Sequence, residues 1–244
     1  MVNDLQTAKR VVSRWRVVRI ALLVALVLFA GLLVLIRVYP YPASFPALPR
    51  STHTSSGTPA DPINIVFIGS QQQISSSFQA AGWLVPDPID AQSMAKIAAA
   101  SLTHSSYPTA PVSNLYVFGH PQDLAFELPT NDVANRGHIR LWKSSMVVSG
   151  EPVWVGQASY DQGIELSATN KLPTHHVAPA VDLERDAVGA DLLKTGMVVS
   201  ETTAAFTTPI FAGRNGGGDF YESDGDALVV NFTHTPAQLT SSDA

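Results

Sequence analysis

One apolar run near the N-terminus constrains the architecture of this chain more than any other feature of its 244 residues. From Ile20 to Ile36 the sequence has no charged or strongly polar residue, and Arg19 and Arg37 close the run at its two ends. About 17 residues is the shortest helix that crosses a bilayer, and flanking Arg side chains can reach the headgroups. A buried helix of a soluble domain seldom lacks a polar face. The run therefore predicts a single transmembrane anchor at residues 20–38, with the lipid bilayer as its partner.

The charges around this run predict its orientation. Five Lys or Arg residues precede it, whereas only Arg50 appears between Arg37 and Lys96. Basic residues beside a span stay preferentially in the cytoplasm, so we expect residues 1–19 inside the cell and the rest of the chain outside, anchored in the cell membrane. A cleaved signal peptide is the competing interpretation. Its apolar core normally has about 7–15 residues and ends in a small-x-small site, and the sequence after Arg37 offers no clean site of that kind.

Charge beyond the anchor excludes one class of partner. Of the 15 basic residues, six lie at or before Arg37, whereas only one of the 20 acidic residues does. The remainder therefore carries nine basic and nineteen acidic residues, and such a domain repels polyanions. Nucleic acid is not expected as a partner. The chain also has no cysteine, which excludes disulfides, thiolate nucleophiles and Cys-based zinc sites.

The remaining sequence predicts one domain between two irregular segments. Residues 39–60 contain five prolines and a Ser/Thr-rich run, which predicts a linker. Residues 61–212 have enough apolar sequence for one domain with its own core. Residues 213–244 are rich in Gly and acidic side chains, which predicts a segment with one last strand and a tail.

Hydrophobic patterns within these limits predict an α+β fold with a mixed or antiparallel sheet and a few helices. Helices are expected at Gln71–Ala81, Ala91–Leu102 and Val181–Leu193, the last with Asp182 as N-cap and Gly196 as stop. Strands are expected at residues 64–69, 115–119, 125–128, 138–142, 152–158, 197–211 and 227–232.

The expected strand at residues 138–142 carries the first candidate site residues. Side chains alternate along a strand, so His138, Arg140 and Trp142 share one face while Ile139 and Leu141 share the other. The first face can form a site, with His138 as acid or base and Arg140 as a clamp for an anion. The alternative is that this strand faces solvent and carries polar side chains for that reason alone.

A second candidate group surrounds two adjacent histidines. His175 and His176 precede a helix that begins with Asp182, Arg185 and Asp186. We predict that His175, His176, Arg185 and Asp186 act with His138 and Arg140 in catalysis, and that His175, His176, Asp182 and Asp186 could hold a divalent metal, although no particular cofactor is indicated. The simpler interpretation is that these acids cap the helix and complement its dipole.

Several short motifs together resemble the LssY C-terminal-like domain family. They are Asp61-Pro62-Ile63-Asn64, Arg136-Gly137-His138-Ile139-Arg140-Leu141-Trp142, Pro152-Val153-Trp154-Val155-Gly156, Tyr160-Asp161, Thr174-His175-His176 and Asp182-Leu183-Glu184-Arg185-Asp186. The family has no assigned biochemical function, and its domains occur alone or attached to bacterial membrane domains, including phosphatases of the phosphatidic-acid type. The resemblance therefore implies a bacterial envelope protein with a lipid-phosphate or protein partner. The phosphatase motif P-S-G-H is absent, and Gly137 stands where the family pattern leads us to expect histidine.

Two hypotheses for function remain open at this point. The first is a hydrolase or transferase that acts on an anionic, phosphate or lipid-linked group at the membrane surface. The second is a non-catalytic envelope binding or scaffold module, in which the same His, Arg and Asp side chains form a structural polar network. An open pocket at the convergence of these side chains favours the enzyme, and a closed cluster whose partners satisfy one another favours the module.

Overall fold

The computed structural model describes residues 15–32, 44–103, 105–131, 135–166, 173–207 and 211–233, in two separate units, Met1–Pro42 and Ala43–Ala244. In the first unit, an 18-residue helix spans Trp15–Leu32, with no part of it buried. Its length, about 27 Å at 1.5 Å per residue, and its composition suffice to cross a membrane. The predicted anchor is therefore confirmed as an apolar helix that begins before Ile20, while residues 33–38 lie outside the described residues.

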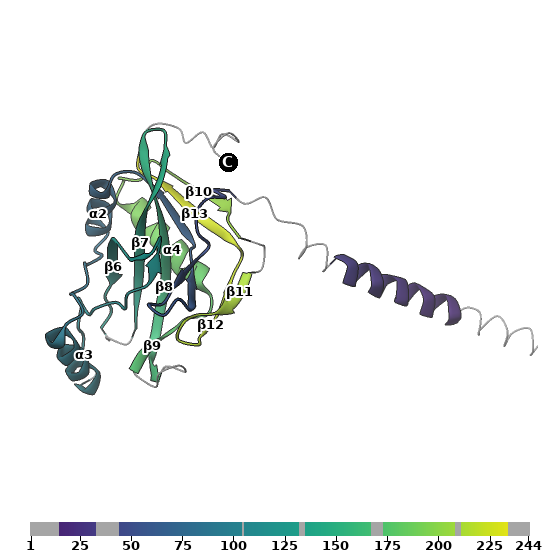
Figure 1. Cartoon of the computed structure of the whole chain (residues 1–244), viewed down its shortest axis with the longest axis horizontal. Coiled ribbons are helices and arrows are strands. Elements are labelled where there is room, and N and C mark those ends of the chain that lie inside the picture. Colours follow the sequence, from purple (N-terminus) through teal and green to yellow (C-terminus); the bar gives the residue numbers. More distant parts are fainter. Residues whose placement is uncertain are drawn as a thin grey trace, which may run out of the picture. The chain divides into compact units, whose positions relative to one another are not determined.

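The second unit is built around a seven-stranded sheet (Figure 1). Its order is β10-β13-β3-β8-β7-β6, and β9 also pairs with β8. The bounds are β3 Ile65–Ile68, β6 Leu124–Leu128, β7 Asn135–Val148, β8 Glu151–Leu166, β9 Pro173–Val177, β10 Ser200–Ala205 and β13 Asp226–Asn231. Only β13 and β3 pair in parallel, and the other neighbours are antiparallel. The predicted mixed sheet of an α+β domain is thus confirmed.

A long hairpin of β7 and β8 lies inside this sheet, between β3 and β6. Its turn places Ser149 and Gly150 at φ of 53° and 87°. Two consecutive residues with positive φ match the right-handed twist of the flanking strands, as in the common two-residue hairpin turns. Long antiparallel pairing then fixes which side chains face each side of the sheet.

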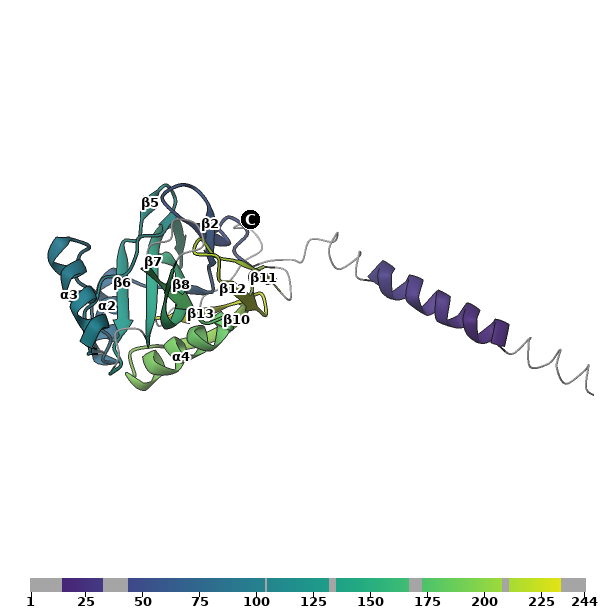
Figure 2. The ribbon, with the colours of Figure 1, turned by 90° about the horizontal axis from the view of Figure 1, so that it is seen from below.

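Helices cover one face of the sheet. They are α2 Gln71–Ala80 and α4 Val181–Lys194, while α3 Ala91–Thr103 lies at the periphery (Figure 2). Ser70 caps α2 in a capping box with Gln73, which explains why this helix begins where it does. Side chains of α2 and α4 pack with β3 and β7 in one core cluster, exemplified by Phe78, Val188, Phe67 and Leu141. The three predicted helices are confirmed.

A smaller sheet covers the opposite face. Its order is β2-β1-β4-β5, with β1 Ser51–His53, β2 Pro59–Pro62, β4 Tyr116–Val117 and β5 His120–Pro121. A separate hairpin joins β11 Phe211–Arg214 to β12 Phe220–Ser223. The second core cluster lies between the smaller sheet and the large sheet and includes Trp142, Val66 and Val153.

Two predicted boundaries are wrong. Residues 44–60 are not a linker, because Phe45 and Leu48 are buried in the second core cluster and β1 and β2 pair with each other. Residues 213–233 are not a separate segment either, because β13 lies between β10 and β3. The predicted last strand is confirmed, but it is a central strand of the domain.

Candidate functional site

Polar side chains gather on the face of β7 that lies away from the helices. His138 and Arg140 alternate with residues that face the helical core cluster, as predicted, and Arg136 lies on the same face as these two. All three are buried, with 4%, 3% and 4% of their surfaces exposed. The face is therefore not a solvent-facing strand surface, and it is not an open site either.

Arg136 lies at the centre of this polar cluster. Its guanidinium donates to Glu127, to the backbone carbonyls of Ala110 and Pro111 at 2.6 and 2.9 Å, and to Asp161 at 3.4 Å. Burial raises the pKa of Glu127 to about 8 and that of Asp161 to about 7, although Arg136 opposes both shifts. Each carboxyl therefore depends on Arg136 for compensation inside the domain.

A serine, a histidine and an aspartate lie next to one another in the same cluster. Ser159 Oγ is 3.0 Å from His138 Nε2, and Asp161 Oδ2 is 3.5 Å from His138 Nδ1. A base between a nucleophile and an orienting acid is the order found in catalytic triads. Here, however, Ser159 is completely buried, and it also accepts a hydrogen bond of 2.7 Å from Gln157.

Arg140 extends the cluster toward the N-terminal strands. It donates to Gln157 Oε1 at 2.8 Å, to the carbonyl of Ser113 at 2.9 Å and to the hydroxyl of Ser113 at 3.1 Å. Its charge also favours the ionised form of buried Asp61, whose pKa is nevertheless raised by burial. Oδ1 of Asp61 has no hydrogen-bond partner among the described residues. The guanidinium of Arg140 thus donates its hydrogen bonds to groups of the protein itself.

The two histidines of the Thr-His-His motif lie on β9, at the edge of the sheet. The backbone of His175 pairs with Ile164, and its side chain is outside the described part of the structure. His176 Nδ1 lies 2.9 Å from Asp219 Oδ1, and the other oxygen of Asp219 accepts from the backbone N–H of Val177 at 3.0 Å. Asp219 therefore ties β9 to the β11–β12 hairpin.

The acidic start of α4 forms a separate ion cluster. Arg185 donates to both carboxylate oxygens of Asp224 at 2.8 and 3.1 Å and to Asp186 at 2.8 Å. Asp182 is not the N-cap, because Ala180 occupies that position without a side-chain hydrogen bond. Asp182 instead accepts from the Ser223 hydroxyl and from the backbone N–H of Asp224. These contacts fasten α4 to the turn between β12 and β13.

The two predicted groups do not share one cleft. Arg140 and His138 face the N-terminal strands, whereas α4 packs on the opposite face of the sheet. The position of Glu184 on α4 shows this directly, because a Cβ atom added at Gly137 would clash with the Oε1 atom of Glu184. A histidine at position 137 would therefore point toward α4 and away from His138. The predicted convergence of His138 with the acids of α4 is wrong.

No metal centre emerges from the predicted ligands that can be examined. His176 contacts Asp219, whereas Asp182 and Asp186 both contact Arg185. Throughout the described part of the chain, no three His, Asp or Glu side chains lie close enough to hold a metal ion.

The comparison with known families matches most of the second unit. Residues 45–227 fit the family described as LssY C-terminus. The chain belongs to the LssY C-terminus family. The match begins before β1 and ends inside β13, in agreement with the corrected domain boundaries. No curated protein matches the chain, and no solved structure does.

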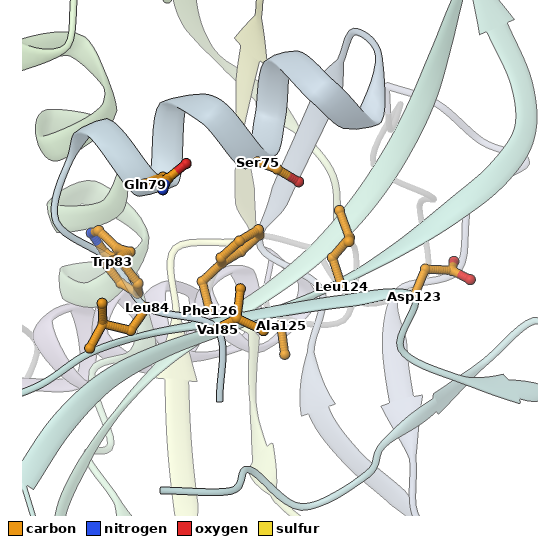
Figure 3. A pocket seen from close by; sticks show the side chains of 9 residues that line it. All are labelled: Ser75, Gln79, Trp83, Leu84, Val85, Asp123, Leu124, Ala125 and Phe126. Atoms are coloured by element: carbon orange, nitrogen blue, oxygen red, sulfur yellow. The ribbon is translucent and has the colours of Figure 1, made fainter. Parts of the chain in front are cut away.

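Two open cavities of this LssY C-terminus domain are lined by residues outside the polar cluster. One, of about 370 Å³, lies between α2 and the outer edge of β6 (Figure 3). The second, of about 430 Å³, adjoins it and is lined by residues of segments 85–89 and 122–125. None of the predicted site residues lines either cavity.

Sequence reasoning missed several members of the polar cluster of this LssY C-terminus domain, and also Asp219, the partner of His176. The missed members of the cluster are Asp61, Glu127, Arg136, Gln157, Ser159 and Asp161. A signal was present for three of them, because Gln157, Ser159 and Asp161 recur at every second position of an otherwise apolar strand. That period places them on one face. Glu127 and Asp219 gave no such signal, since their partners are distant in the sequence.

Proposed function

We propose that this LssY C-terminus protein is a non-catalytic binding or scaffold module, tethered by its N-terminal helix to the cell membrane with its domain outside the cytoplasm. The closed polar cluster carries the proposal. Its arginines and carboxyls are buried and bonded mainly to one another or to backbone carbonyls. Such a network stabilises one arrangement of the strands, and none of its members lines either of the two cavities. The basic segment before the helix supports the orientation.

The orientation can be tested with single cysteines, because the chain has none of its own. Ser55 is exposed in the turn before β2, and Ser13 lies in the basic segment. In intact cells, a membrane-impermeant maleimide should label the Ser55→Cys variant and not the Ser13→Cys variant. Both should be labelled after lysis. The reverse pattern would place the domain in the cytoplasm and refute this part of the proposal.

A hydrolase is the second candidate, because Ser159, His138 and Asp161 have the order of a catalytic triad. The reaction would require the hydroxyl of Ser159 to attack a substrate while His138 takes its proton. Burial opposes this reaction, since a nucleophile must reach its substrate. A hydroxyl that joins a histidine to a glutamine inside a core also has a structural role.

A fluorophosphonate probe separates these two functions. It phosphonylates an activated serine, so the full chain in membranes should remain unlabelled if Ser159 is structural. The Ser159→Ala variant is the control for any background reaction at other hydroxyls. Labelling of the wild type that disappears in Ser159→Ala would establish an activated nucleophile and overturn the non-catalytic proposal.

A further inference from the structure

The outer edge of β6 has backbone groups that the fold leaves free. Glu127 exchanges two backbone hydrogen bonds, of 2.8 and 2.9 Å, with Leu84, so its N–H and C=O point away from β7. Backbone direction alternates along a strand, and the N–H and C=O of Ala125 therefore point to the same outer edge. Ala125 has no backbone partner there among the described residues. Ala125 is half-buried at this edge.

The pairing with Leu84 stops for a clear reason. In the antiparallel register that joins Leu84 to Glu127, the residue opposite Ala125 is Pro86. Proline has no N–H to donate, and the chain from Val85 onward instead forms a wall of the adjoining cavities. An open strand edge of this kind can pair with another extended chain.

The two cavities lie on either side of this free edge and differ in character. Both include Val85, Leu124 and Ala125 in their linings. The first cavity is mainly apolar, with Trp83 and Phe126 beneath α2 (Figure 3). The second contains Asp87, Asn114 and Gln122, and Asp123 lies in the lining of both cavities. Successive side chains of an added strand would point alternately into an apolar cavity and a polar one.

Charge indicates what the polar cavity accepts. Two carboxylates, Asp87 and Asp123, line it, and no Lys or Arg is among its lining residues. Lys96 approaches Asp87 at 3.6 Å, whereas Asp123 has the imidazole of His120 at 3.8 Å and accepts from the backbone N–H of Lys143 at 2.7 Å, with no Lys or Arg side chain paired to it among the described residues. Hydrogen bonding by Tyr107 lowers the pKa of Asp87, so this carboxylate stays ionised. The cavity therefore favours basic side chains.

We propose that the edge of β6 at Ala125 binds an extended segment of a partner protein in which apolar and basic residues alternate. The segment adds a strand to the sheet through the N–H and C=O of Ala125, its apolar side chains enter the cavity under α2, and its basic side chains meet Asp87 and Asp123. This inference rests on the proposed function as a binding module and names the class of its partner.

Two synthetic octapeptides test the proposal on the full chain in detergent micelles. One alternates valine and lysine, and the other alternates valine and glutamate. At about 0.15 M salt, where charges more than about 8 Å apart are largely screened, we expect fluorescence anisotropy to show binding of the lysine peptide at least about tenfold tighter. Opposite charges across a binding surface raise affinity, and like charges oppose it.

A proline at position 125 tests the strand pairing itself. Ala125→Pro removes only an outward N–H, which edge strands tolerate, and should weaken binding of the lysine peptide by about tenfold, as expected for lost main-chain hydrogen bonds. Ala125→Ser keeps the N–H and serves as the matched control. If Ala125→Pro does not fold, Val85→Lys provides the second test, because Val85 is 68% exposed in the cavity wall. That variant should reduce the preference for the lysine peptide, because the added cation offsets one of the two carboxylates.

Three results would overturn this proposal. They are equal binding of the two peptides, undiminished binding to Ala125→Pro when that variant is folded, and a dimer of the wild type that Ala125→Pro dissociates. The last result would make a second copy of this chain the occupant of the edge. None of them depends on fluorophosphonate labelling or on the orientation in the membrane, so failure here is distinguishable from failure of the proposed function.

Discussion

A fragment that begins at Asp61 should not fold, whereas a fragment that begins at Ala43 should give a cooperative domain. The shorter fragment lacks β1, together with Phe45 and Leu48, which are only 6% and 5% exposed in the domain. Burial of two such side chains contributes roughly 4 kcal/mol, at about 2 kcal/mol each. Native domains have a total stability of about 5–15 kcal/mol. The lost strand pairing and the contact of Arg50 with the Phe206 ring, at 4.0 Å, add to this deficit.

Circular dichroism during thermal unfolding measures this difference directly. The fragment from Ala43 should show a single sharp transition, and the fragment from Asp61 should show none or should aggregate. A third fragment that ends at residue 212 is the complementary test, because it removes β13 from between β10 and β3. Equal melting temperatures for the fragments from Ala43 and Asp61 would show that residues 44–60 are dispensable.

The predicted linker failed because composition is a local signal, whereas burial depends on distant contacts. Proline and Ser/Thr-rich sequence normally indicates an unpacked segment. Here the hydroxyl of Thr52 donates to the carbonyl of Asp61 inside the domain, and Arg50 donates to the carbonyls of Ser44 and Phe45. Apolar periodicity was a better guide, since it predicted β3, β6 and the helices close to their observed positions, and it predicted the start of β8 but not its end at Leu166.

The candidate site shows the same division between local and distant information. Strand alternation correctly predicted that His138 and Arg140 share a face. It could not show that residues 110–113 cover this face, because that contact joins parts of the chain about 26 residues apart. Nor could a helical pattern show which face of the sheet α4 covers, since both faces are apolar at β3.

Replacement of Arg136 by methionine should destabilise the domain more than any other single substitution in the polar cluster. Methionine keeps most of the volume and removes the cation. Glu127 and Asp161 would then lie buried, at 0% and 2% exposure, without their main compensating charge. At about pH 9, above the pKa of about 8 that burial gives Glu127, removal of one partner from this buried ion pair should cost about 3–5 kcal/mol, because the remaining charge is uncompensated. Urea denaturation of the full chain in micelles would measure the loss.

The control substitution is Lys143→Met, which removes a cation from the exposed side of the same strand. Arg136, in contrast, is buried, so only Arg136→Met should shift the urea denaturation midpoint by a large amount. Surface substitutions such as Lys143→Met usually change the free energy of unfolding by less than about 0.5 kcal/mol. Similar effects of the two substitutions would indicate that burial of the cluster is unimportant.

A double-mutant cycle between Arg136 and Glu127 tests most directly whether the polar cluster is a structural network. The free energy of unfolding is measured for the wild type, Arg136→Met, Glu127→Met and the double variant. We expect the double variant to lose less stability than the two single variants combined, with a coupling of about 2–3 kcal/mol, because neither charge is then left alone in the core. Losses that add to within about 0.5 kcal/mol would show that the two side chains act independently, and would contradict the structural role assigned to the cluster.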